Sequence, residues 1–229
     1  MELQGVCKDF LNTSRVECIF SKYKTNYVFS NMNITNAVKR LCNFANILII
    51  ESIKIAKSKG LILPIVYNTN STDTLETIKA LNGYIDIYLP DFKYYDDNLA
   101  AKYSAAPDYR ETAEKAVEEM LRQCGKPIVE NGIIKRGVII RHLVLPGSRS
   151  DSINVIRLIA EKFGDAAVSI MRQYTPVFNR SQFSELNRSI TSFEYDSVVK
   201  EAVKCRLKGF TQIKGCETKD YTPDFNEIY

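Results

Sequence analysis

The chain has 229 residues, of which 45% are hydrophobic and 25% are charged, and its formal net charge is +4. These values are ordinary for a globular protein, and they exclude a disordered, collagen-like or low-complexity chain. The length fits one large domain, or one domain with an additional segment. A chain of this length can bury a hydrophobic core without the help of disulfide bonds or bound metals. No apolar run is long enough for a signal-peptide core or a membrane span, so we expect a cytoplasmic protein and no membrane partner.

Charge and cysteine content limit the partners and metal sites of this chain. Residues 1–60 hold nine basic and four acidic side chains, and the remainder is close to neutral. Because the basic residues are scattered and no run of Lys or Arg exceeds two, we do not expect nucleic-acid binding. The cysteines contain no C-x-x-C pair, so neither a zinc knuckle nor a disulfide framework is expected. They are Cys7, Cys18, Cys42, Cys124, Cys205 and Cys216.

Helices and strands are predicted to alternate along the first half of the chain. Ile49, Ile53 and Ala56 repeat at helical spacing, and Asp73 with Glu76 has the spacing of a capping box. The apolar runs between the predicted helices indicate short buried strands. In chain order the predicted elements are helix 47–59, strand 61–68, helix 74–82, strand 84–92 and helix 96–103.

The second half continues this alternation. Cys124 lies on the apolar stripe of an amphipathic helix, which predicts a small core residue. Asn131-Gly132 predicts a loop or small hairpin, and Ser150 or Asp151 is expected to cap the helix that follows. In chain order the predicted elements are helix 109–124, the loop or hairpin at 127–136, strand 137–145, helix 152–163, strand 166–174 and helix 194–208. No periodicity is visible in 211–229.

Near-continuous apolar strands between amphipathic helices indicate a parallel sheet with helices outside it. Neither a G-x-G-x-x-G fingerprint nor a P-loop is present, which disfavours a dinucleotide-binding or NTPase fold. Only four strands are clearly predicted, whereas a full barrel has eight. The sequence therefore predicts an α/β fold in the form of a partial, open TIM-type (β/α) barrel.

Polar residues stand where the predicted strands end, and ligands of barrels and open α/β sheets bind at that edge. Because side chains alternate along a strand, Asp91 and Lys93 share one face and aim a carboxylate and an ammonium at the same space. Such a pair fits a zwitterion, such as an amino-acid group, and it equally fits a structural ion pair. The strand-end residues are Asn68, Thr69, Asp91, Lys93, Arg141, His142 and Gln173.

Arg141 and His142 are neighbours, so only one of them can face the barrel interior. His142 is the only histidine of the chain and cannot build a metal site alone. A buried Arg141 requires an anion, which is either Asp91 or a ligand carboxylate or phosphate. The residues themselves leave the choice between Arg141 and His142 open.

Several ordered segments give the chain a resemblance to a known family. It resembles the radical S-adenosylmethionine proteins related to pyruvate formate-lyase activating enzyme, from about residue 47 to 212. This resemblance implies a partial barrel over 46–212, an atypical or truncated segment over 1–45 and a C-terminal tail over 213–229. The segments that carry it are LPIVYNTN (63–70), DIYLPDFKYYD (86–96), KYSAAPDY (102–109), RGVIIRHLVLPG (136–147), VSIMRQYTP (168–176) and ELNRSIT (185–191).

The resemblance also implies a function. In such proteins a 4Fe-4S cluster binds and reduces S-adenosylmethionine, and the resulting 5′-deoxyadenosyl radical abstracts hydrogen from a substrate. The implied partner is a glycyl-radical enzyme or another protein substrate. Asp91 and Lys93 match the family's Asp-x-Lys strand end, and Arg141 matches its strand arginine, which selects Arg141 over His142 as the inward side chain. With the strand-end residues Asn68 and Gln173, these form the predicted S-adenosylmethionine-binding set.

The chain departs from the family at the cluster loop. The family holds its cluster with a C-x-x-x-C-x-x-C loop, whose three thiolates leave one iron open. Cys18 lies where this loop is expected, but no cysteine stands at the required offsets, so we assign no metal ligand and no catalytic residue. Three hypotheses remain: a radical-generating protein, a non-catalytic barrel remnant that binds S-adenosylmethionine or a partner, and a different barrel enzyme that uses Arg141 for a phosphate or carboxylate.

Overall fold

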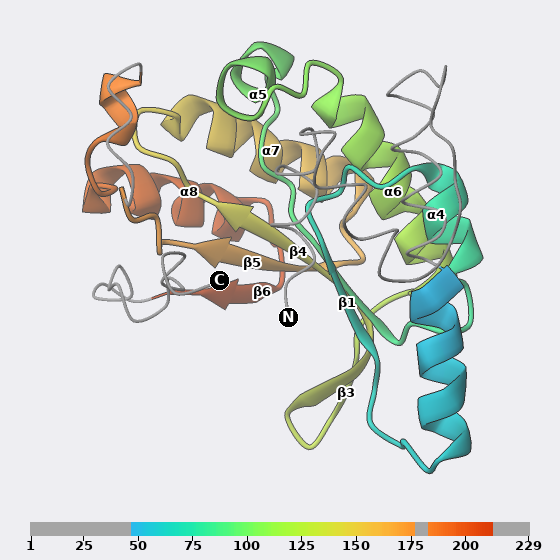
Figure 1. Cartoon of the computed structure of the whole chain (residues 1–229). Coiled ribbons are helices and arrows are strands. Elements are labelled where there is room, and N and C mark those ends of the chain that lie inside the picture. The colour runs from blue at the N-terminus through green and yellow to red at the C-terminus, as the bar shows by residue number, and fades with distance from the viewer. Residues whose placement is uncertain (1–46, 177–182, 213–229) are drawn as a thin grey trace, which may run out of the picture. The chain divides into compact units, whose positions relative to one another are not determined.

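The computed structural model describes residues 47–176 and 183–212 (Figure 1). The chain divides into two units, Met1–Ala45 and Asn46–Tyr229, and every described residue belongs to the second. The predicted N-terminal segment 1–45 and tail 213–229 lie outside the described residues, so the predicted domain limits stay predictions.

The described strands form one open, six-stranded sheet (Figure 1). β3 (Ile128–Glu130) pairs antiparallel with the first part of β4, and the other strands run parallel. Each parallel strand lies next to the parallel strand before it, as in a (β/α) barrel, but β1 and β6 are left as edges among the described residues. The predicted fold, a partial TIM-type barrel, is confirmed. The parallel strands are, in order, β1 (Val66–Thr69), β2 (Ile87–Pro90), β4 (Ile133–Leu143), β5 (Ala167–Met171) and β6 (Gly209–Thr211).

Helices connect the parallel strands, and a side-chain cap marks the start of three of them, α4, α5 and α8. Thr191 and Glu194 form a capping box at the start of the last helix. No described helix is long and apolar enough to cross a lipid bilayer. After an unlabelled helix at 47–58, the helices are α4 (Leu75–Ala80), α5 (Asp97–Ser104), α6 (Tyr109–Cys124), α7 (Arg149–Lys162), the short 3-10 helix η1 (Ser184–Leu186) and α8 (Ser192–Lys204).

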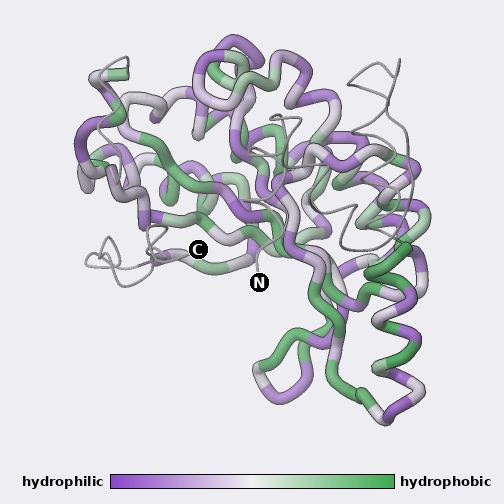
Figure 2. Tube along the Cα trace, viewed as in Figure 1, coloured by the Kyte–Doolittle hydropathy of each residue, from purple (hydrophilic) through white to green (hydrophobic). Residues whose placement is uncertain are grey.

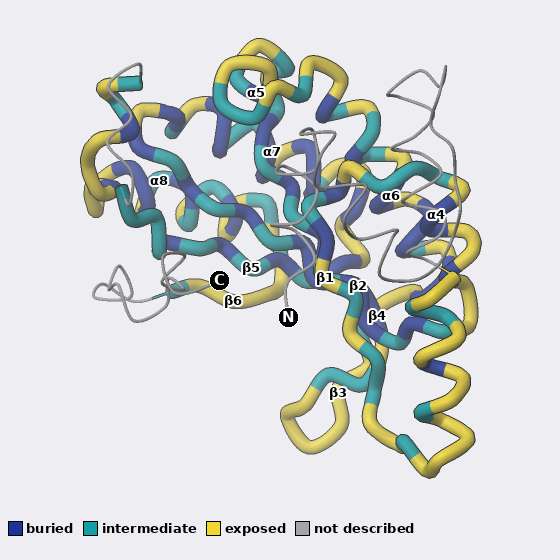
Figure 3. Tube along the Cα trace, in the orientation of Figure 1, coloured by how far each residue is buried: buried dark blue, intermediate teal, exposed yellow. Residues whose placement is uncertain are grey.

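The two faces of the sheet are buried to different extents (Figure 3). The face that packs against the helices carries side chains that are at most 2% exposed: Tyr88, Val138, Ile140, His142, Val168 and Ile170. On the opposite face, a row of paired residues crosses the carboxyl ends of the strands: Asp91, Arg141, Ser169 and Phe210. The first three are only partly buried, and Phe210 is exposed. The row therefore lies on the face of the sheet that the described helices do not cover.

The hairpin predicted at Asn131-Gly132 is confirmed, and it lengthens β4 beyond its predicted start at residue 137. Both turn residues have positive φ angles, 52° and 77°, as a two-residue hairpin turn requires. β1 begins at Val66 and not at residue 61. Pro64 has no N–H, and the N–H of Ile65 donates to the Asp86 carboxylate at 2.8 Å, so neither contributes an N–H to the ladder.

β6 was not predicted from the sequence. It has three residues and ends at the start of residues 211–229, where no periodicity is visible. Such a strand is too short to show alternation. Its pairing depends on Gly209, because a Cβ there would lie 1.8 Å from the carbonyl oxygen of Val168 in β5.

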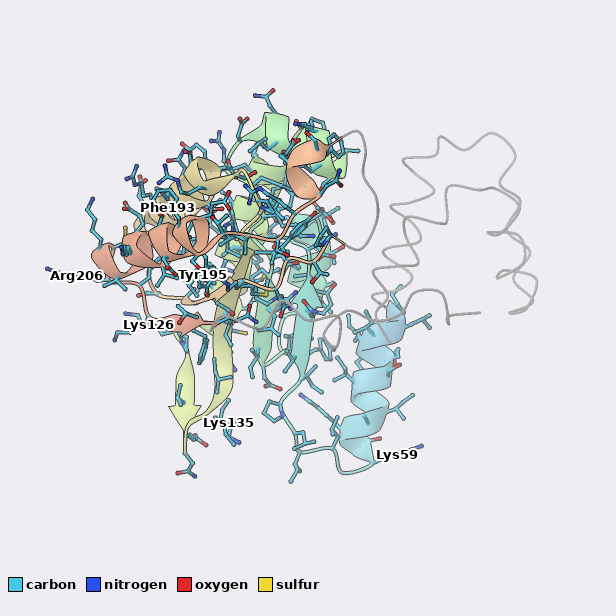
Figure 4. All side chains as sticks on the ribbon, turned by 90° about the vertical axis from the view of Figure 1, so that its left-hand side faces the viewer. Lys59, Lys126, Lys135, Phe193, Tyr195 and Arg206 are labelled. Atoms are coloured by element: carbon cyan, nitrogen blue, oxygen red, sulfur yellow. The ribbon has the colours of Figure 1, made fainter. Side chains whose placement is uncertain are left out.

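Exposed apolar side chains gather at the amino-terminal end of the sheet, away from the Asp91 row. They lie on the helix at 47–58 with the loop after it, and on the β3–β4 hairpin (Figures 2 and 3). Figure 4 places Lys59 and Lys135, which belong to these two segments, at the end of the molecule away from Phe193 of α8. The exposed residues are Ile47, Leu48, Ile55, Ile62, Leu63, Ile128, Val129 and Ile133.

His142 lies within the core and joins β4 to the end of β2. Its Nδ1 atom is 2.7 Å from the carbonyl oxygen of Phe92, so Nδ1 carries the hydrogen and donates it. Its Nε2 atom has no hydrogen-bond partner within the described residues. Burial disfavours the imidazolium and lowers the pKa of His142 to about 4.

We predict that His142 makes the free energy of unfolding depend on pH. The unfolded chain binds a proton at this residue below about pH 6.5, whereas the folded chain does so only near pH 4. Stability from this residue is therefore complete well above pH 6.5 and falls as the pH drops toward 4, by about 2.5 kcal/mol at pH 4.5. His142→Asn keeps a donor near Phe92 but cannot titrate. Urea unfolding between pH 4.5 and 7 should show a smaller loss in the variant, and parallel pH profiles would contradict the prediction.

Candidate functional site

Three of the predicted residues meet at the carboxyl ends of neighbouring strands. Arg141 of β4 donates from Nε to Oδ1 of Asp91 at 2.8 Å, and its Nη2 lies 2.7 Å from the same oxygen. Nη2 also donates to Oδ1 of Asn68 in β1 at 2.7 Å. One guanidinium thus links β1, β2 and β4 through side chains.

Lys93 extends this group toward the surface. Its Nζ atom is 3.7 Å from Oδ2 of Asp91, an ion pair longer than a hydrogen bond. The side chain of Lys93 is 37% exposed, against 14% for Asp91 and 25% for Arg141. We call Asn68, Asp91, Lys93 and Arg141 the strand-end cluster. With one carboxylate and two cations, the cluster has a net charge of +1 and can pair with both an anionic and a cationic group of a ligand.

Backbone pairing places these side chains on one face of the sheet. Asp91 forms a parallel bridge with Arg141, and the N–H of Phe92 donates to the carbonyl of Arg141 at 2.8 Å. Side chains alternate along strands, so Asp91 and Arg141 point to the uncovered face while the next pair, Phe92 and His142, points to the helices. The choice between Arg141 and His142 that the residues left open is thereby settled in favour of Arg141.

The loop after β1 is held by Asp73, which does not cap α4 as the sequence analysis expected. Thr74 is the N-cap, and its side chain accepts the N–H of Thr77. The Asp73 carboxylate instead accepts from the hydroxyls of Thr69 and of Tyr67, the latter at 3.3 Å. Burial raises the pKa of Asp73 above its usual value. The expected cap was wrong because two hydroxyl groups of β1, just before the loop, compete for this carboxylate.

A similar correction applies to α7. Ser148 is its N-cap, and Asp151 lies in the first turn of the helix. The Asp151 carboxylate accepts the backbone N–H groups of Tyr95 and Asp96, the latter at 2.8 Å. Asp151 also lines an open groove of about 540 Å³ with α5 and the first turn of α7, and this groove contains none of the strand-end cluster. Asp151 thus orders the loop after β2 from the α7 side.

Gln173, the remaining predicted site residue, lies outside the strand-end cluster. It follows β5, and its Oε1 atom accepts from Nε2 of Gln212 at 3.0 Å. Gln212 in turn accepts the N–H of Arg172 at 2.6 Å, so Gln173 belongs to a separate network beside β6.

Sequence reasoning missed Tyr109, whose hydroxyl touches the backbone at the ends of β1 and β2. Tyr109 was assigned only as the first residue of a helix. The one signal was its place at the end of the KYSAAPDY segment, which does not reveal where a side chain reaches.

The described residues do not fit a 4Fe-4S cluster at this site. They include two cysteines, Cys124 and Cys205, which lie on α6 and at the end of α8. Cys124 is 5% exposed, as the sequence predicted for a core residue, and burial raises the pKa of its thiol. No group of three or more His, Cys, Asp or Glu side chains in the described ranges is placed to hold a metal ion. Cys18 lies outside those ranges.

Comparisons with known proteins agree with the fold. No family model matches the chain. The uncharacterized protein MJ0674 of Methanocaldococcus jannaschii is 27% identical over 147 residues, which are 63% of this chain and 39% of that protein. The chain thus spans about two fifths of the length of this relative.

A solved structure is similar as well. The crystal structure of a domain of pyruvate-formate lyase-activating enzyme from Bacteroides vulgatus matches 75% of this chain and 94% of that domain, with a TM-score of 0.52 and 13% sequence identity. At this identity the likeness shows a shared fold.

We predict that Asp91 and Arg141 stabilise the fold jointly. In a double-mutant cycle with Asp91→Asn and Arg141→Met, the coupling energy should be about 1–2 kcal/mol, because two charge-assisted contacts are partly shielded from solvent. The control cycle uses Glu111 and Lys115, an exposed pair on α6 that should show little coupling. Denaturant unfolding measures both cycles, and additive effects of the Asp91 and Arg141 substitutions would contradict the prediction.

Proposed function

We propose that the strand-end cluster binds S-adenosylmethionine, and that the chain acts as a radical S-adenosylmethionine protein of the activating-enzyme type. The observation that carries this proposal is the meeting of Asp91, Lys93 and Arg141 at the carboxyl edge of a partial barrel. The resemblance of the sequence and the shared fold with a domain of pyruvate-formate lyase-activating enzyme support the choice of ligand.

The charges of the cluster suit the methionyl part of this ligand, which carries a carboxylate, an ammonium and a sulfonium group. Oδ1 of Asp91 accepts both contacts from Arg141, whereas Oδ2 has only the long contact to Lys93 among the described residues. Oδ2 is therefore the oxygen that accepts from a ligand ammonium. Lys93 can turn to a ligand carboxylate without breaking a hydrogen bond to Asp91, because their separation is 3.7 Å.

The remaining residues orient the ligand. Arg141 is anchored to Asp91 and Asn68, which fixes the plane of its guanidinium before a ligand arrives. This preorganisation lowers the entropic cost of binding. Gln173 remains a proposed contact for a more distant part of the ligand, reached along β5 and independent of the strand-end cluster.

The family resemblance implies a 4Fe-4S cluster, which would supply reducing power for S-adenosylmethionine. The described residues place no thiolates at this site for such a cluster, so the role we propose for them is to bind and orient the ligand. The partner that suits this function is a glycyl-radical enzyme or another protein that donates a hydrogen atom. A second candidate function, a non-catalytic barrel that binds S-adenosylmethionine, is favoured by the positions of Cys124 and Cys205 away from the site.

We predict that Lys93→Ala weakens binding of S-adenosylmethionine by about 1.5–3 kcal/mol, the scale of a charge-assisted hydrogen bond. This corresponds to a dissociation constant roughly ten to a hundred times larger. Lys115→Ala, on the exposed face of α6, serves as the control for the loss of one positive charge. Isothermal titration calorimetry measures the affinities, and equal affinities of the parent and Lys93→Ala would remove Lys93 from the site.

Anaerobic reconstitution with iron and sulfide separates the candidate functions. The radical-generating protein should acquire the brown absorbance of a 4Fe-4S cluster, and Cys18→Ser should diminish it if Cys18 is a ligand. A colourless protein that binds S-adenosylmethionine supports the non-catalytic barrel. Binding of a sugar phosphate without binding of S-adenosylmethionine contradicts both and supports the third hypothesis.

A further inference from the structure

Tyr109 brings one hydroxyl group to three backbone groups beside the strand-end cluster. It is the first residue of α6 and is 2% exposed. Its hydroxyl lies 2.7 Å from the carbonyl oxygen of Asp91 and 3.2 Å from that of Asn70, and it accepts the N–H of Lys93 at 2.9 Å. A phenol has one hydrogen and two acceptor lone pairs, so it can donate to Asp91 while it accepts from Lys93.

These backbone groups lie where the ladder between β1 and β2 ends. The bond from the N–H of Asp91 to the carbonyl of Thr69, 2.8 Å long, precedes the Tyr109 contacts along both strands. Buried backbone groups beyond that bond require another partner. Tyr109 supplies it, and so holds the segment from Asp91 to Lys93 that carries the two charges of opposite sign.

The surrounding rings fix the position of this hydroxyl. The Tyr109 ring meets Phe92 edge to face at 6.3 Å and Tyr94 at 5.5 Å between ring centroids. Burial also raises the pKa of Tyr109 well above its ordinary value, so the phenol keeps its hydrogen. The contact is therefore a fixed feature of the packed core.

The same arrangement occurs a second time in this chain, between β5 and β6. Tyr195 lies in the first turn of α8 (Figure 4). Its hydroxyl donates to the carbonyl of Ile170 in β5 at 2.9 Å and accepts the N–H of Gln212, after β6, at 2.7 Å. In both places a helix tyrosine joins two neighbouring strand ends.

We propose that Tyr109 is a positioning residue of the strand-end cluster. It touches neither the ligand nor the charged groups, and it sets the backbone from which Asp91 and Lys93 project. Its effect on ligand affinity rests on the proposed function, whereas its effect on the geometry of the cluster does not.

The test compares Tyr109→Phe with Tyr88→Phe in the full-length chain. Both substitutions remove one hydroxyl and keep a buried ring. Tyr88 lies on β2 itself, is fully buried and donates to Oε1 of Gln123 at 2.7 Å, on the helix side of the sheet. The two variants should therefore lose similar stability, and only Tyr109→Phe should disturb the cluster.

If Tyr109 positions the strand-end cluster, the affinity for S-adenosylmethionine should fall about tenfold in Tyr109→Phe and stay unchanged in Tyr88→Phe. Amide exchange of Lys93 should accelerate in Tyr109→Phe alone, because its N–H loses the phenol oxygen. Equal affinities of the parent and both variants would overturn the positioning role and leave the proposed function intact.

If the parent protein does not bind S-adenosylmethionine, the proposed function is wrong. The positioning role of Tyr109 is then tested by the NMR signal of the Arg141 Nε–H, which donates to Asp91. A shifted signal in Tyr109→Phe but not in Tyr88→Phe supports the positioning role, and an unshifted signal overturns it. Should Tyr109→Phe not fold, 3-fluorotyrosine at position 109 changes the donor strength of the phenol and keeps the ring. An unchanged Arg141 signal in that protein also overturns the inference.

Discussion

The contact between Asp91 and Arg141 is the interaction on which the candidate site depends. It joins two strands that are far apart in sequence but adjacent in the sheet, and it occurs where their backbones form their last bridge. The Arg141 side chain is three quarters buried, so its charge requires an anion, and Asp91 provides one within the chain. Because Arg141 uses only Oδ1 of Asp91, Oδ2 is left for the ligand that we propose. The stability of the sheet edge and the proposed ligand binding thus depend on one charge arrangement.

The site and the core are built from consecutive residues of the same strands. Asp91 and Arg141 face the uncovered side, while Phe92 and His142 face the helices and form the hydrogen bond that holds the same strand ends from behind. The helix layer therefore acts on the site through the backbone, although its side chains lie on the other face of the sheet. The two neighbouring residues thus have different roles: the buried His142 holds the backbone of Phe92, and Arg141 on the opposite face binds Asp91.

The sequence predicted the features that arise from local patterns. Side-chain alternation placed Asp91 and Lys93 together, and Asn131-Gly132 predicted the hairpin, because both depend on neighbouring residues alone. The features it missed depend on contacts in the folded chain that residue spacing does not encode. Asp73 has the spacing of a helix cap, yet its carboxylate accepts hydrogen bonds from Thr69 and Tyr67. The three residues of β6 are too few to show alternation, and the strand is defined by the close approach of Gly209 to Val168. The selection of Arg141 over His142 came from the family resemblance, since adjacent residues on one strand give no local signal.

The central proposal is that this edge of the sheet binds S-adenosylmethionine, and the charge arrangement at the strand ends supports it. The most direct measurement is a titration of the isotope-labelled full-length chain with S-adenosylmethionine, followed by NMR. The account predicts that the largest shifts occur at the Lys93 amide, the Asn68 side-chain amide and the Arg141 Nε–H. An absence of saturable shifts, or shifts confined to the groove around Asp151, would contradict it.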